Sequence, residues 1–198
     1  MSPYDCRMPD LTALVARLQA DPHHVPASGD RAAAVLALVV LDPEPAVLFT
    51  ERAASMSRHA GEVSFPGGLR DLEDRSLEAT ALREAHEELG LDPRSVRVLG
   101  ALEPIHTYVS AILVTPFVDL MDRLPPLEPN AGEIARVFTV PLRTLSAVEE
   151  RRVLHRDERG TFHGWWYQTD DATIWGATGF MLHALLELLR EETPWLRT

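Results

Sequence analysis

Three glutamates gather on one turn of a predicted helix, Glu84, Glu87 and Glu88, directly behind Arg83. An α-helix advances about 100° per residue, so the three carboxylates fall within an arc of roughly 100°. Like charges at this spacing cost about 0.2–0.5 kcal/mol per pair, so the cluster needs a positive partner or a task. Oxygen ligands on one rigid helix suit a hard divalent cation, Mg²⁺ or Mn²⁺, better than zinc. The pattern indicates a cation site that can grip a phosphate, although the helix alone also fits a solvated charged face.

A glycine loop leads into this helix and favours the cation site. Residues 61–68 read GEVSFPGG, in which Pro66 fixes the backbone ahead of Gly67 and Gly68. Two residues without side chains let the backbone approach a ligand or metal closely. On the helix itself, Arg83 precedes Glu87 by four residues, so an ion pair can hold that carboxylate in position.

The loop and helix together resemble the Nudix box, G-x5-E-x7-R-E-U-x-E-E-x-G-U, where U is a bulky apolar residue. Gly68 takes the place of the opening glycine, and residues 83–91 form the closing half. The stretch between Gly68 and Arg83 is one residue longer than in the general pattern, and Ala85 replaces the bulky residue. The upstream glutamate is missing, and Asp74 is its nearest substitute.

These departures resemble a branch of Nudix hydrolases that cleaves coenzyme A. That branch has the longer box with REA, preceded by the signature L-R-x-H-x-G-E/Q-V-x-F-P-G-G. Residues 59–68 match its later part, whereas Arg58 stands directly before His59 and does not align with the Leu-Arg pair. Further similar stretches are VTPFV at 114–118, EIARVFTVPL at 133–142 and IWGAT at 174–178. The resemblance implies a metal-dependent pyrophosphatase that converts coenzyme A to 4′-phosphopantetheine and adenosine 3′,5′-bisphosphate.

The expected metal ligands are glutamates of the box. Glu84 and Glu88 are four residues apart, so both aim at one point on the helix surface. Glu87 binds the metal directly or through a water molecule. The resemblance implies that the backbone carbonyl of Gly68 completes the set.

The expected catalytic and substrate contacts lie around this set. Glu87 and Glu133 are both candidates for the general base that takes a proton from the attacking water, and Arg83 supports Glu87. The basic residues near the loop are candidates for reading the 3′-phosphate of coenzyme A, and His59 for the phosphates or the pantetheine arm. The predicted substrate-binding residues are Arg52, Arg58, His59, Gly67 and Arg70.

Composition limits the partners and the compartment. Lys and Arg total 19 and Asp and Glu total 30, a net charge of −11, which argues against nucleic acid and anionic membrane surfaces as partners. The single cysteine, Cys6, cannot form a disulfide within the chain. With no signal segment and no apolar run long enough to span a bilayer, the expected location is the cytoplasm. The expected partner is a small nucleotide-like molecule, and a homodimer is compatible with the sequence.

The elements that position the site follow from periodicity and turn signals. Residues 10–20 and 179–192 have apolar residues at helical spacing, the latter with Thr178 as a candidate N-cap, and the acidic helix covers 76–89 with a stop at Gly90. Apolar runs at 32–41 and 46–52 flank the turn DPEP and predict a strand pair. Further strands are expected at 96–105, at 110–120, up to Pro141, and as a pair around 158–160.

This order predicts an α/β fold with a mixed sheet flanked by helices. We expect a single domain over residues 1–198, in which residues 1–30 form an N-terminal helix and loop appendage. The Nudix resemblance implies an α/β/α sandwich.

Two other functions stay open on the sequence. The first is a Nudix hydrolase of ADP-ribose, a dinucleotide or a nucleoside triphosphate, which the 57–66 signature argues against. The second is a non-catalytic protein that senses a nucleotide, which the intact set of Glu84, Glu87 and Glu88 argues against. The sequence does not separate free coenzyme A from acyl-coenzyme A, or Mg²⁺ from Mn²⁺.

Overall fold

The computed structural model describes residues 11–18, 31–54, 60–107, 111–157, 160–193 and 196. The helices are α1 (Leu11–Arg17), α2 (Leu77–Leu89), α3 (Leu142–Val148) and α4 (Gly176–Glu192), with a 3-10 turn at Pro93–Ser95. The strands of the large sheet are β1 (Arg31–Val40), β2 (Ala46–Arg52), β3 (Val63–Ser64), β4 (Gly67–Leu69), β5 (Gly100–Ala101), β6 (Ile105–His106), β7 (Ile112–Met121) and β8 (Ile134–Pro141). A small sheet contains β9 (Glu149–Asp157), β10 (Gly160–Gln168) and β11 (Thr173–Ile174).

Strand β1 lies at the centre of the large sheet. It runs parallel to β7 along its whole length and antiparallel to β2 and β4. Strand β2 also pairs with β8, in antiparallel register from Ala46–Pro141 to Arg52–Ile134. The predicted mixed sheet is confirmed, and so is the predicted strand ending at Pro141.

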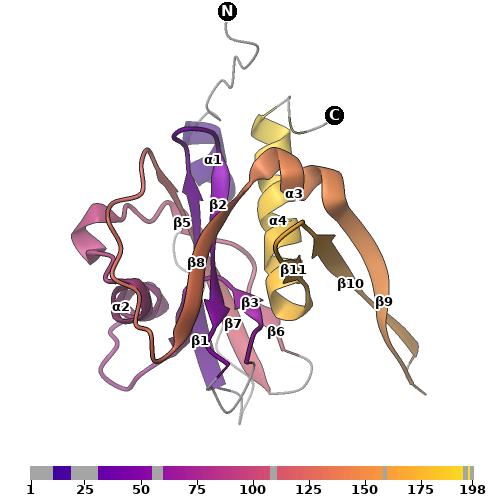
Figure 1. The fold of residues 1–198 in the computed structure, drawn as a ribbon, viewed down its shortest axis with the longest axis horizontal. Coiled ribbons are helices and arrows are strands. Elements are labelled where there is room, and N and C mark those ends of the chain that lie inside the picture. The colour runs from indigo at the N-terminus through magenta and orange to yellow at the C-terminus, as the bar shows by residue number, and fades with distance from the viewer. Residues whose placement is uncertain are drawn as a thin grey trace, which may run out of the picture.

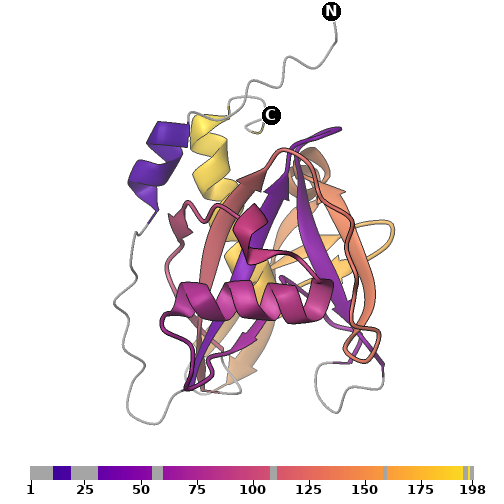
Figure 2. The same cartoon turned by 90° about the vertical axis from the view of Figure 1, so that its left-hand side faces the viewer.

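Helices cover both faces of this sheet. Figure 1 shows α2 on the left of the sheet and α4 on its right, and Figure 2 shows α2 lying across the sheet face. Side chains of β1 alternate between the two cores, because successive residues of a strand point to opposite faces. Val35 and Ala37 belong to the core on the α4 side, and Leu36 and Leu38 to the core on the α2 side. The predicted sheet flanked by helices is therefore confirmed.

A buried polar cluster ties α4 to the small sheet. Glu149 Oε1 accepts hydrogen bonds from Tyr167 Oη at 2.6 Å and His183 Nδ1 at 3.0 Å, and Arg190 Nη1 lies 2.7 Å from Glu149 Oε2. Burial raises the pKa of Glu149, but these three donors outweigh burial and leave the pKa lowered. The cluster fixes the small sheet beside the large one, which shapes the pocket described below.

The predicted strand over 96–105 is wrong in extent. Only Gly100–Ala101 and Ile105–His106 pair with β7, as β5 and β6. Pro104 lies between them and has no backbone N–H to donate to a ladder, so the segment cannot pair continuously.

The predicted N-cap Thr178 is also wrong, because α4 begins at Gly176. The N–H of Gly179 already donates to the carbonyl of Trp175, and Trp175 with its extended backbone is the N-cap. Thr178 lies inside the helix and is buried.

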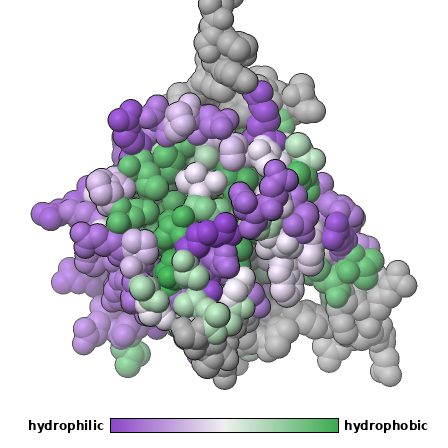
Figure 3. Space-filling view, viewed as in Figure 1, coloured by the Kyte–Doolittle hydropathy of each residue, from purple (hydrophilic) through white to green (hydrophobic). Residues whose placement is uncertain are grey.

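The N-terminal helix is shorter than predicted, and its Leu14 is fully buried in the α4-side core. An ion pair joins Arg17 to Glu191 of α4. Among the described residues, no helix is both long and apolar enough to cross a bilayer. Figure 3 shows an apolar patch on the β9–β10 hairpin, where Val153 and Leu154 are exposed, and a larger apolar area left of centre.

Candidate active site

The acidic helix is confirmed, with clear signals at both ends. Ser76 is the N-cap, and its Oγ accepts a hydrogen bond from the N–H of Ala79 at 3.1 Å. Gly90 is the C-cap at φ 69°, a left-handed conformation that glycine adopts without strain. The predicted start and stop of this helix therefore both hold within one residue.

Small side chains bring α2 close to the sheet. Its buried apolar stripe consists of Ala81, Ala85 and Leu89, spaced four residues apart. Leu82, next to this stripe, is only half-buried. Glu88 is 3% exposed, so the solvated charged face does not describe this helix.

The glycine loop presses directly against the glutamates. The N–H of Gly67 donates to Glu88 Oε2 at 3.1 Å, while β4 pairs with residues 33–35 of β1. A Cβ on Gly68 would lie 2.5 Å from Glu84 Oε1, so a larger residue there would displace that carboxylate. The sheet thus holds the loop, and the loop holds the carboxylate of Glu88 and leaves room for that of Glu84.

Burial makes these two carboxylates costly to charge. It raises the pKa of Glu88 to about 7, against the opposing effects of the Gly67 N–H and Arg52. Burial also raises the pKa of Glu84, which the charges of Glu87 and Glu133 raise further and Arg83 lowers. A cation bound between the two carboxylates would offset the cost of burying their charges and the repulsion between them.

Asp74, the nearest substitute for the missing upstream acid, holds Arg83. Its carboxylate accepts from Arg83 Nε at 3.0 Å and Nη2 at 2.9 Å, and also from Thr80 Oγ1 and the N–H of Asp71. Arg83 Nη1 in turn donates to Glu84 at 3.0 Å and to Glu87 at 2.9 Å. The predicted Arg83–Glu87 ion pair is present, and the structure adds Asp74 as its anchor.

We expect Asp74→Asn to lower the free energy of unfolding by about 1.5–3 kcal/mol at pH 7, since it removes charged hydrogen bonds to Arg83. The Arg83 guanidinium, with two further donors, holds the pKa of Asp74 far below its usual range. A depressed folded-state pKa gives stability that is present above the unfolded value of about 3.9 and is lost as pH falls below it.

Urea titrations of both proteins from pH 7 to pH 3 test this expectation. The difference between wild type and variant should shrink below about pH 4, where the unfolded chain also protonates. Asp71→Asn, in the same loop, is the control. A difference that stays constant across this range would contradict the role given to the Asp74 charge.

Glu133 reaches the site through a loop that packs on the end of α2. The N–H of Asn130 donates to the carbonyl of Glu88 at 2.9 Å, and that of Glu128 to Leu89 at 2.8 Å. Asn130 Oδ1 accepts from the N–H of Gly132, and Asn130 Nδ2 donates to Glu133 Oε1 at 3.3 Å. Glu133 thereby lies close enough to raise the pKa of Glu84 and Glu88. Residues 129–132 read Pro-Asn-Ala-Gly, a turn signal from which this loop could have been predicted.

The predicted substrate contacts divide into three groups. Arg52 faces the glutamates, with Nη1 3.7 Å from Glu88 Oε1. Arg70 is exposed and donates to the carbonyl of Asp74 at 3.1 Å, so it closes the loop ahead of the helix. Arg58 and His59 lie outside the described residues.

A divalent cation fits the donors around Gly68. Among the described side chains, no three His, Cys, Asp or Glu already converge on one point. Glu84 and Glu87 each accept a hydrogen bond from Arg83, and this keeps their carboxylates from converging. To bind a cation, each carboxylate would replace its hydrogen bond to Arg83 with a bond to the cation. The Glu84 carboxylate lies directly against Gly68, and the pKa values of both Glu84 and Glu88 are raised, which favours a cation held by these two residues.

Comparisons with known proteins agree with the fold and the loop–helix site. The NUDIX domain family matches residues 30–179. A protein named "Uncharacterized Nudix hydrolase NudL" from Photorhabdus laumondii is 40% identical over 161 residues, covering 80% of this chain and 84% of its own. The protein of the same name from Cronobacter sakazakii is 41% identical over 158 residues, covering 78% and 81%.

Among solved structures, the E. coli ORF135 protein aligns at a TM-score of 0.50 and 16% identity, covering 84% of this chain and 97% of its own. A mixed sheet whose glycine loop feeds an acidic helix defines a class of hydrolases that act on phosphoanhydride bonds. The chain belongs to the Nudix hydrolase family. Enzymes of this family use divalent cations.

Proposed function

We propose that this Nudix hydrolase cleaves the pyrophosphate bond of coenzyme A, giving 4′-phosphopantetheine and adenosine 3′,5′-bisphosphate. The observation that carries the proposal is the stretch His59–Gly68, which extends the box upstream and matches the coenzyme A branch. This stretch adjoins the site, because the N–H of Arg52 donates to the carbonyl of Glu62 at 3.0 Å and Gly67 bonds Glu88.

Glu84, Glu88 and the carbonyl of Gly68 would hold Mg²⁺ or Mn²⁺, with Glu87 as a further candidate. When bound, the cation neutralises the phosphate charge. Arg52 lies beside Glu88 and is placed to bind a phosphate oxygen of the substrate. In doing so it would release Glu88 to bind the cation.

We assign the general base to Glu133 rather than Glu87. Glu87 Oε2 already accepts a hydrogen bond from Arg83 Nη1 at 2.9 Å, so this oxygen is engaged by the arginine. Glu133 is bonded through the neutral amide of Asn130, and it faces the same two glutamates. In this scheme Glu133 takes a proton from the water that attacks phosphorus.

The test of the proposed function compares substrates that differ by one group. Wild type with Mg²⁺ should hydrolyse coenzyme A and prefer it over dephospho-coenzyme A by roughly 10- to 150-fold in kcat/KM, the value of one charge-assisted contact to the 3′-phosphate. Mass analysis of products from acyl-coenzyme A, ADP-ribose, NADH and dNTPs in the same assay ranks the alternatives.

Arginine variants then locate the contact to the 3′-phosphate. Arg58→Ala or Arg70→Ala should abolish the preference for coenzyme A. Equal rates for both substrates in wild type mean that the 3′-phosphate is not read. Faster turnover of ADP-ribose or a dNTP than of coenzyme A would assign the protein to the Nudix hydrolases of those substrates. If no substrate is turned over, the remaining alternative is a non-catalytic protein that senses a nucleotide.

Three further proposals concern organisation. We infer a single domain over residues 1–198, since α1 packs on α4. A homodimer is proposed because β9 is an edge strand with exposed Val153 and Leu154. The lone Cys6 supports the cytoplasm as the compartment.

A further inference from the structure

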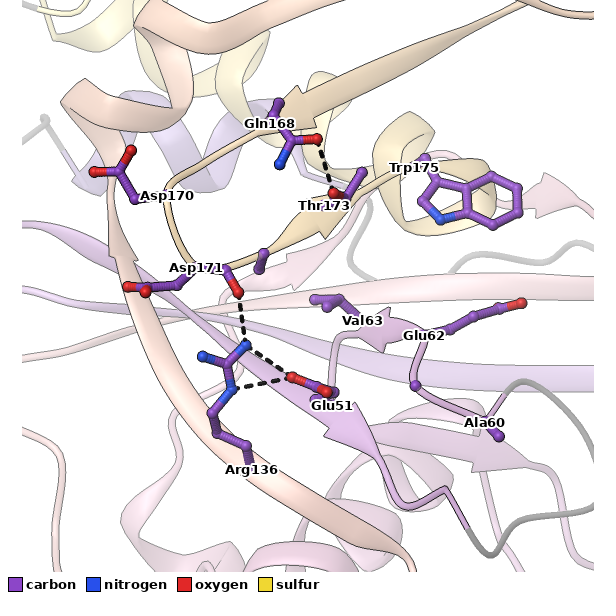
Figure 4. Close-up of a pocket in the computed structure, with 12 residues that line it drawn as sticks. Glu51, Ala60, Glu62, Val63, Arg136, Gln168, Asp170, Asp171, Thr173 and Trp175 are labelled. Atoms are coloured by element: carbon purple, nitrogen blue, oxygen red, sulfur yellow. Dashed lines mark hydrogen bonds and ion pairs between the residues drawn. The ribbon is translucent and has the colours of Figure 1, made fainter.

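A polar pocket lies on the other side of β2 from helix α2, which carries the candidate metal ligands. It is a cavity of about 390 Å³ between β2, β8, the residues before β3 and the turn that joins β10 to β11. Figure 4 shows Arg136 between Glu51 and the backbone of Asp171, with Trp175 on the opposite side. Arg136 and Trp175 lie in stretches that resemble the coenzyme A branch, but the sequence predicted no role for any of these side chains.

The pocket begins next to the candidate active site. Arg52 reaches Glu88 on α2, and the preceding residue of β2, Glu51, lines the pocket. Gly61 and Glu62 line it too, and they stand just ahead of the glycine loop. The glutamates and the pocket therefore lie at the same end of β2, beside neighbouring residues of that strand.

The charge of the pocket is negative and its single lining arginine is already engaged. Arg136 donates to Glu51 Oε2 from Nε at 3.0 Å and Nη2 at 2.7 Å, and Nη2 also donates to the carbonyl of Asp171 at 3.0 Å. Glu62, Asp170 and Asp171 add three more carboxylates. Among the described residues, the side chains of Asp170 and Asp171 have no hydrogen-bond partner.

This arrangement repels phosphate and offers acceptors to N–H and O–H groups. An anion placed here would lie among four carboxylates and one arginine that Glu51 neutralises. Trp175 is 44% exposed and stacks against Trp166 at 5.8 Å, so it adds an apolar wall. A neutral chain with amide donors and an apolar end matches these surroundings.

The two ends of the proposed substrate differ in this respect. The adenosine end of coenzyme A carries the 3′-phosphate, whereas the pantetheine arm is uncharged and has two amide N–H donors, a hydroxyl and a thiol. Resting on the proposed function, we propose that this pocket binds the pantetheine arm. The carboxylates of Asp170 and Asp171 accept hydrogen bonds from the amides, and the negative charge directs the phosphoadenosine end to the Arg52 side.

Binding of the two half-molecules to the full chain tests the assignment without turnover. The probes are 4′-phosphopantetheine, adenosine 3′,5′-bisphosphate and inorganic phosphate, titrated calorimetrically in Mg²⁺. The double variant Asp170→Ala/Asp171→Ala changes two exposed side chains of a turn, so the fold should be retained, and its thermal unfolding verifies this. Asp122→Ala, an exposed acid beyond β7, is the control for charge.

We expect the double variant to weaken 4′-phosphopantetheine binding about tenfold, the value of a lost charged acceptor, with adenosine 3′,5′-bisphosphate binding unchanged or tighter. The control should leave both unchanged. Loss of adenosine 3′,5′-bisphosphate binding alone would place the base in the pocket and overturn the assignment. Wild type that binds 4′-phosphopantetheine no better than inorganic phosphate, or a double variant that binds it normally, also overturns it. Failure to hydrolyse coenzyme A, measured in the separate rate assay, removes only the proposed function.

Discussion

Glu88→Gln should lower kcat/KM for coenzyme A by about a hundredfold or more in saturating Mg²⁺, because a metal supplies several kcal/mol of charge stabilisation at the phosphate. Gln keeps the shape of Glu88 and can still accept the hydrogen bond from Gly67, so the change is mainly one of charge. Turnover equal to wild type would rule out Glu88 as a ligand.

The same variant should be more stable than wild type when the metal is chelated. The pKa of Glu88 is about 7 in the folded chain, above its unfolded value, so ionisation costs stability as pH rises. In EDTA at pH 8 we expect Glu88→Gln to gain about 1–3 kcal/mol, a gain that disappears below about pH 4.

Added Mg²⁺ should reduce the stability advantage of the variant over wild type. At a hundred times its dissociation constant, Mg²⁺ stabilises the wild type by about 2.7 kcal/mol, and the variant should gain less. Glu78→Gln, an exposed glutamate in the first turn of α2, is the matched control and should change neither rate nor metal response. A variant that is less stable than wild type in EDTA at pH 8 would contradict the proposed burial cost.

Gly67→Ala should lower the free energy of unfolding by about 2–6 kcal/mol, which lowers the melting temperature by at least about 4 °C. Gly67 has φ 151°, where a side chain is strained. Its Cβ would also lie 2.4 Å from the carbonyl oxygen of Ala34 and 2.5 Å from the Cα of Val35. Both are backbone atoms of the central strand, so neither can move aside.

Gly160→Ala is the control that separates strain from the clash. Gly160 has φ 135°, and a Cβ there meets nothing within 4 Å. It should cost about 1–3 kcal/mol by strain alone, and Gly67→Ala should exceed it by about 1–3 kcal/mol of overpacking. Thermal and urea unfolding of both variants measure the difference. Equal losses would mean that β1 does not hold the glycine loop in place.

The sequence by itself determined the elements with strong local signals. The acidic helix with its Gly90 stop, the strand pair around DPEP and the central apolar strands follow from periodicity and turn chemistry, which act over a few residues. The Arg83–Glu87 pair was predictable for the same reason, since helix geometry fixes residues four apart. Local pattern failed at 96–105, where Pro104 and the partner strand β7 decide which backbone groups pair.

Tertiary structure decided the properties of the site that depend on distant segments. The helical wheel places Glu88 near the other acids, but only packing against Gly67 and Arg52 buries it and raises its pKa. Asp74 can hold Arg83 only because the loop that carries Asp74 packs against the helix. The pocket depends on Glu51, Arg136 and residues 168–175, which β-sheet pairing and the docking of the small sheet bring together. No local signal reports such a meeting, because burial and charge are set by neighbours that the chain supplies from far away in sequence.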